Sequence, residues 1–95
     1  MLNIEQQQKI IEVMLPFQPK WIGVFGSFAR GDNKESSDID LLVDFKNDSI
    51  NLLQIIGIEQ DLEKKFNRKI QLVTNRALNP NLRPNVEKDL KIIFQ

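Results

Sequence analysis

Two aspartates one residue apart, Asp38 and Asp40, and a Gly26-Ser27 pair upstream are the residues of this chain best suited to chemistry. Side chains two residues apart on a strand point to the same face, with Cα atoms about 6.7 Å apart. Carboxylates spaced in this way can hold Mg²⁺, and phosphoryl-transfer sites use metal ions about 3.5–4 Å apart. A Gly-Ser turn lets backbone N–H groups approach a phosphate, and a helix starting there adds its positive dipole end. The combination predicts a site for a nucleoside triphosphate with Mg²⁺.

Each half of this pattern also has an ordinary structural explanation. A Gly-Ser pair is common where a strand turns into a helix, with Ser27 as the N-cap. Aspartates are common on the solvated face of an alternating strand. At average residue usage, both halves at this fixed spacing arise by chance in roughly one chain of this length in a thousand. The joint pattern therefore indicates a site.

Composition limits the chemistry that such a site can use. The chain has 95 residues, with 13 basic and 13 acidic side chains and a formal net charge of zero, which argues against strong nucleic-acid or anionic-membrane binding. It has no histidine and no cysteine, so acid–base or metal chemistry must use carboxylates. A polar N-terminus and the lack of an apolar run near 18 residues give no sign of a signal peptide or membrane span. We expect one soluble, cytoplasmic domain over residues 1–95.

Hydrophobic periodicity and turn residues predict the order α-β-α-β-α-β-α. Helices are expected from Asn3 to Pro16, over 26–30, from a Ser49 cap to about residue 66, and from Pro84 through an apolar stripe that ends at Phe94. Strands are expected over 21–25, 38–45 and 69–73, the second with one face on the core and one face open. These elements indicate an α/β (α+β) fold, a small mixed sheet with helices packed on one face.

Placed on these elements, residues 26–31 (GSFARG) and 37–43 (SDIDLLV) resemble the minimal nucleotidyltransferases of the DNA polymerase beta superfamily. The resemblance extends over nearly the whole chain. It implies that Gly26 and Ser27 grip the triphosphate, and that Asp38 and Asp40 bind Mg²⁺ and are catalytic. Arg30 has two interpretations, contact with phosphate or pairing with an acid in the 32–35 loop.

The third strand departs from the pattern of the family. The resemblance implies a third catalytic carboxylate at the position of Gln71, whose amide oxygen is neutral and cannot usefully accept a proton. Asp44 lies about 13 Å from Asp40 along the strand, too far to replace it. The other candidates are predicted to lie on solvated helix faces: Asp61, Glu63, Glu87 and Asp89. We therefore predict that binding of the triphosphate with Mg²⁺ is retained while transfer is slow or absent.

The resemblance implies a function and a partner. It implies transfer of AMP from ATP to a hydroxyl of a partner protein of the HEPN type, an RNase toxin that the nucleotidyltransferase neutralises as its antitoxin. The alternative, based on Gln71, is a weak or inactive module that binds nucleotide or partner. Transfer to a small molecule such as an aminoglycoside ranks last, because those enzymes carry an added domain. The acceptor residue, the choice of ATP over another triphosphate, and homo- or hetero-oligomeric assembly stay open.

Aromatic and basic residues near these motifs have a structural and a functional explanation. For the aromatic residues beside the strands, core packing is favoured over base stacking. These are Trp21, Phe25 and Phe45. Phe28 either flanks the nucleotide or packs beneath the loop. For the basic cluster before the third strand, a solvated helix end is favoured over attraction of an acidic partner or RNA. This cluster is Lys64, Lys65, Arg68 and Lys69.

Overall fold

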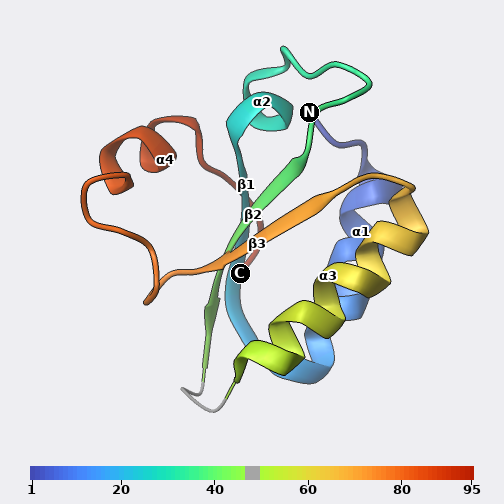
Figure 1. Ribbon diagram of the computed structural model, residues 1–95, viewed down its shortest axis with the longest axis vertical. Helices are drawn as coiled ribbons and strands as arrows, with labels where there is room; N and C mark the ends of the chain where they lie inside the picture. The colour runs from blue at the N-terminus through green and yellow to red at the C-terminus, as the bar shows by residue number, and fades with distance from the viewer. Residues whose placement is uncertain (47–49) are drawn as a thin grey trace.

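The computed structural model describes residues 1–46 and 50–95 and builds them around a four-stranded sheet (Figure 1). Its elements are α1 (Ile4–Met14), the 3-10 turn η1 (Leu15–Phe17), β1 (Pro19–Phe25), α2 (Gly26–Arg30), β2 (Ile39–Phe45), α3 (Leu52–Phe66), β3 (Ile70–Thr74), α4 (Arg83–Asp89) and β4 (Lys91–Phe94). The strand order is β3-β2-β1-β4, with β2 and β3 parallel and the other pairs antiparallel. The predicted mixed sheet is confirmed.

Helices α1 and α3 begin with the same reciprocal capping arrangement. The Asn3 side chain accepts a hydrogen bond from the Gln6 N–H at 2.8 Å, and the Gln6 side chain accepts one from the Asn3 N–H at 2.9 Å. Asn51 and Gln54 repeat this arrangement at α3, and each pair satisfies two amides that the helix leaves unpaired. The predicted start at Asn3 is confirmed, while the predicted cap Ser49 lies outside the described residues. None of the helices in 1–46 and 50–95 combines the length and hydrophobicity that a bilayer crossing requires.

The sheet carries helices on both faces, not on one as predicted. Side chains alternate along β2, so that Ile39, Leu41 and Val43 join a core with residues of α1 and α3. Leu42 points the other way and is fully buried in a second cluster with Leu78 and with Val86 of α4. Figure 1 shows α4 on the side of the sheet opposite α1 and α3. The prediction of an open second face failed because Leu42 gives α4 an apolar surface to cover.

The C-terminal segment is a strand, which corrects the predicted continuous helix. Helix α4 ends at Asp89, and Leu90 adopts φ −59° and ψ 128°. Residues of β4 then pair antiparallel with β1, as in Gly23 with Ile92. Apolar residues near the C-terminus suit a helical stripe and a strand equally well in a short window. Pairing decides between them, because without β4 the backbone groups of β1 would be left open at the edge of the sheet.

Strand β3 forms one outer edge of the sheet, and α3 occupies two of its backbone donors. The Leu72 N–H donates to the Glu59 carboxylate at 2.8 Å, and the Ile70 N–H donates to the Glu63 carboxylate at 3.2 Å. The prediction that Glu63 lies on a solvated helix face is therefore wrong. Two amides that could pair with a strand of another chain are satisfied within this one.

Gly57 lies in the exposed middle of α3, and a Cβ added there meets no atom within 4 Å. We expect Gly57→Ala to stabilise the protein by about 1 kcal/mol, since Gly costs that much relative to Ala inside a helix. The melting temperature should rise by about 4–8 °C, as measured by circular dichroism. Gly23→Ala is the matched opposite, because its Cβ would crowd the Leu90 side chain. A lower melting temperature for Gly57→Ala would contradict the prediction.

Candidate functional site

Strand register brings the predicted site residues to one end of the sheet. Asp40 of β2 pairs with Phe25 of β1 on one side and with Gln71 of β3 on the other. Phe25 is the residue before Gly26, so the Gly-Ser turn starts beside Asp40. Asp38 lies one residue before β2, at the end of the loop that follows α2. The turn, both aspartates and Gln71 therefore converge on the end of β1 that leads into α2.

Gly26 is required at this turn for two independent reasons. Its φ is +72°, a left-handed conformation that glycine adopts at little cost. A Cβ built on Gly26 would also collide with Oδ2 of Asp40, so the backbone lies directly against this carboxylate. Helix α2 begins at Gly26, and its N-cap residue Phe25 provides no side-chain hydrogen bond. The N-cap residue therefore leaves the first amides of α2 available to an anion such as phosphate.

Asp40 is a partly buried acid whose pKa is shifted by its surroundings. Burial of its carboxylate raises the pKa of Asp40 above its ordinary value, the nearby Asp38 charge raises it further, and Arg30 partly opposes both. The ionised form is thus held at a cost, which a bound cation would relieve. Two carboxylates with hard oxygen donors, beside a turn without a Cβ, fit a divalent cation such as Mg²⁺. Within 1–46 and 50–95, no group of three or more His, Cys, Asp or Glu side chains could hold a metal ion.

Gln71 occupies the position at which a third carboxylate was expected. It is exposed on β3 and lies in register beside Asp40. Aligned residues on neighbouring strands project to the same face, so the Gln71 side chain leaves the sheet on the same face as the Asp40 carboxylate. Asp61 and Glu87 are exposed on helices, as predicted, and Asp44 lies four residues further along β2. The site is thus a pair of carboxylates with a neutral amide as neighbour.

Arg30 pairs with acids, the second of its two predicted roles. Its Nε donates to Asp32 at 3.1 Å and its Nη1 to Asp89 at 2.7 Å. These bonds raise the pKa of Arg30 further above its ordinary value. Asp89 was predicted on a solvated face and instead has a mostly covered side chain, because it ties α4 to the end of α2. No sequence spacing could indicate this pair, whose members are 59 residues apart.

The aromatic residues pack as predicted, whereas one residue of the basic cluster is not solvated as predicted. Phe45 is buried in the main core, and Trp21 and Phe25 pack on the second cluster. Phe28 is buried too, under the guanidinium of Arg68 at 5.0 Å from the ring centroid. Three members of the basic cluster are exposed as expected: Lys64, Lys65 and Lys69. Arg68 is half-buried against the 31–37 loop, a contact that only the folded chain reveals.

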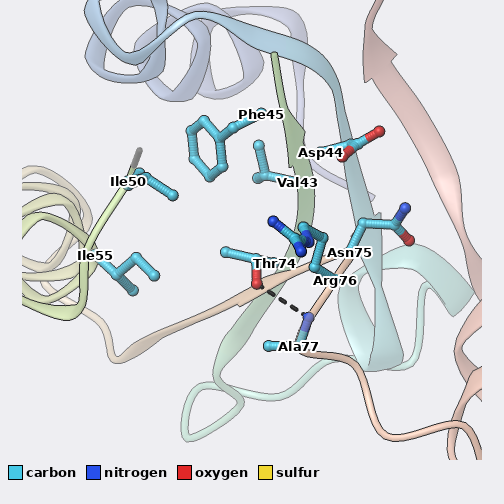
Figure 2. Close-up of a pocket in the computed structure, with 9 residues that line it drawn as sticks. All are labelled: Val43, Asp44, Phe45, Ile50, Ile55, Thr74, Asn75, Arg76 and Ala77. Carbon is cyan, nitrogen blue, oxygen red and sulfur yellow. Dashed lines mark hydrogen bonds between the residues drawn. The ribbon is translucent and has the colours of Figure 1, made fainter. Parts of the chain in front are cut away.

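A cavity of about 350 Å³ lies at the far ends of β2 and β3 from Asp40 (Figure 2). Its apolar lining includes Phe45, Ile50 and Ile55, and its polar residues belong mainly to the turn after β3. Figure 2 shows the bond that closes this turn, from the Ala77 N–H to Oγ1 of Thr74 at 3.3 Å. No predicted site residue lines this cavity. The candidate site is therefore the opposite end of the sheet, where Asp38 and Asp40 lie.

Known proteins resemble this chain in sequence and in fold. The family described as "Polymerase beta, Nucleotidyltransferase" matches residues 8–95. Protein adenylyltransferase MntA of Thermococcus cleftensis is 35% identical over 95 residues, covering 95% of this chain and 95% of its own.

Two solved structures share the fold. A toxin–antitoxin structure with AMP-PNP has a TM-score of 0.85 at 24% identity, over 98% of this chain and 73% of its own. A Shewanella oneidensis structure of a tri-AMPylated HEPN toxin in complex with its MNT antitoxin has a TM-score of 0.77 at 21% identity, over 95% of this chain and 70% of its own.

Proposed function

The chain belongs to the polymerase beta nucleotidyltransferase family, and we propose that it transfers AMP from ATP to a hydroxyl group of a partner protein. The observation that carries the proposal is the strand register at Asp40. It places this carboxylate against the Gly26 turn on one side and beside Gln71 on the other. Phosphate-binding backbone and metal-binding acids thus adjoin, as transfer of a nucleotidyl group requires.

In this proposal the residues of the chain have separate roles. The backbone of Gly26 and Ser27 receives the phosphates at the start of α2, while Asp38 and Asp40 hold Mg²⁺. Mg²⁺ held by these two carboxylates would neutralise phosphate charge and polarise the reacting phosphoryl group. The acceptor hydroxyl loses its proton to solvent as its oxygen forms a bond to the α-phosphorus. The bond from that phosphorus to the bridging oxygen of the β-phosphate breaks, and pyrophosphate leaves. Arg30 anchors α2 on α4 through Asp89 and so supports the turn.

The relatives support ATP as donor and a protein as acceptor. A protein adenylyltransferase is 35% identical to this chain, and a protein of the same fold was crystallised with AMP-PNP, an ATP analogue. The Shewanella complex joins a related fold to an AMPylated HEPN toxin. We propose a HEPN-type toxin as the partner, residues 1–95 as one catalytic unit, and the ATP-containing cytoplasm as the location.

Gln71 supports a second candidate function, a module that binds nucleotide and partner with little or no transfer. A neutral amide beside Asp40 neither attracts a second cation strongly nor accepts the proton of the acceptor. The two candidates differ in one measurable quantity, the rate at which labelled AMP becomes attached to the partner.

We expect Gln71→Asp to accelerate transfer at least about tenfold, since a positioned acid–base group contributes about a hundredfold or more. The measurement uses ATP labelled in its α-phosphate, Mg²⁺, and the protein encoded by the neighbouring gene, with label on that protein followed over time. Slow labelling by the natural chain supports the enzyme, whereas nucleotide binding without any label supports the module. Gln60→Asp, the same change at an exposed position of α3, is the matched control. A natural chain that is already fast, with no gain in Gln71→Asp, would refute the role given to position 71.

A further inference from the structure

Arg68 holds the loop that carries Asp38. It lies between α3 and β3, and its Nη1 donates to three backbone carbonyls of the 31–37 loop. The acceptors are Lys34 at 3.1 Å, Glu35 at 2.7 Å and Ser37 at 2.6 Å. Hydrogen bonds from a charged donor are about twice as strong as neutral ones. One side chain therefore fixes the backbone up to the residue before Asp38.

The same guanidinium also contacts the helix that begins at the Gly-Ser turn. Its central carbon lies 5.0 Å from the ring centroid of Phe28, which follows Ser27 in α2 and is buried. An arginine above an aromatic ring at this distance gains a cation–π attraction. Arg68 thus joins the two parts of the site, the turn that receives phosphate and the loop that ends at Asp38.

Asp38 needs such support more than Asp40 does. Asp40 is fixed within β2 by strands on both sides, whereas Asp38 precedes the strand. The ladder begins one residue later, where the Ile39 N–H donates to the Lys69 carbonyl at 3.0 Å. On its other side, Asp38 follows the Ser37 carbonyl bound by Arg68. Two bonds from the segment before β3 therefore bracket Asp38.

We propose that Arg68 is a positioning residue for the metal site. It holds the carboxylate of Asp38 where this carboxylate can share a divalent cation with Asp40. The proposal rests on the proposed function, because it assumes that these two aspartates bind the cation. In this proposal Arg68 acts without binding nucleotide or metal itself. Its effect comes through the loop backbone, as for residues that support a metal ligand from behind.

The test measures Mn²⁺ binding and amide hydrogen exchange in the full chain, without nucleotide. We expect Arg68→Ala to weaken Mn²⁺ binding by about tenfold, the lower end for loss of a residue that supports a metal ligand. The Ser37 amide, which donates to the Lys34 carbonyl at 3.0 Å, should exchange faster. Arg68→Lys keeps a donor but not the planar stacking group, so it should retain part of the Mn²⁺ affinity and part of the protection of the Ser37 amide. It replaces Arg68→Ala in the test if that variant folds poorly.

Arg83→Ala is the matched control, because Arg83 also closes a turn through its guanidinium, by bonds to Asn75 at 3.0 Å and 2.9 Å. It should leave Mn²⁺ binding unchanged. Faster exchange in Arg68→Ala with wild-type Mn²⁺ affinity would overturn the positioning role and leave a purely structural one. Mn²⁺ binding that also survives Asp38→Asn would instead show that the proposed metal site itself is wrong.

Discussion

Asp40→Asn is expected to abolish transfer while making the free protein more stable at neutral pH. Transfer should fall by more than about a hundredfold, because loss of a residue that only supports a metal ligand lowers activity about 10–100-fold, and the proposed function makes Asp40 a ligand itself. The measurement is attachment of labelled AMP to the partner. Asp44→Asn removes a carboxylate from the same strand, four residues further along, and should leave transfer unchanged. Wild-type transfer by Asp40→Asn would refute the assignment of this residue.

The stability change follows from the raised pKa of Asp40. The folded chain binds the proton of Asp40 more tightly than the unfolded chain does, because burial and Asp38 disfavour the ionised form. Ionised Asp40 therefore destabilises the fold above its folded-state pKa, and this cost disappears as the pH falls from there to below the ordinary value of 3.8. The asparagine variant should melt at a higher temperature than the natural chain at pH 7, and the difference should vanish near pH 3. A variant that is less stable at pH 7 would contradict this account.

Gly26→Ala is the second substitution with a large expected effect, and it should remove nucleotide binding. Its Cβ would collide with the Asp40 carboxylate at a backbone φ of +72°, so the turn or the carboxylate must move. We expect the affinity for AMP-PNP with Mg²⁺ to fall by more than about tenfold, since the turn and the metal ligand are both displaced. Titration calorimetry measures the affinity.

Gly31→Ala separates backbone strain from the collision. Gly31 has a similar φ of +83°, but a Cβ there meets nothing within 4 Å. Alanine in this conformation costs about 1–2 kcal/mol, so Gly31→Ala should lower the melting temperature but retain nucleotide binding. If both variants bound AMP-PNP equally well, the close approach of Gly26 to Asp40 would have no functional role.

The Gly26-Ser27 and Asp38/Asp40 pattern was sufficient to predict the family and the convergence of these residues, and the resemblance to that family then implied an acid where this chain has Gln71. Its information is local: a strand repeats every two residues, a turn needs a particular backbone conformation, and metal ligands need oxygen. Helix starts were readable for the same reason, since Asn3 and Gln6 cap one another across a single turn. The last helix was predicted to continue through Ile93 and Phe94. This prediction was wrong because a short apolar run suits a helix and a strand equally well.

Contacts between residues distant in sequence were decided only by the tertiary structure. Strand β4 exists because β1 offers it a partner, and α4 covers the second face because Leu42 offers it an apolar surface. The pair of Arg30 with Asp89, and the grip of Arg68 on the 31–37 loop, join residues 59 and at least 31 positions apart. Charged side chains have no periodicity that reveals a distant partner, so the sequence left Asp89 and Arg68 on solvated surfaces and did not pair Arg30 with Asp89. The sequence alone indicated which groups are the candidates for the chemistry, while the tertiary structure decided which residues hold those groups in place.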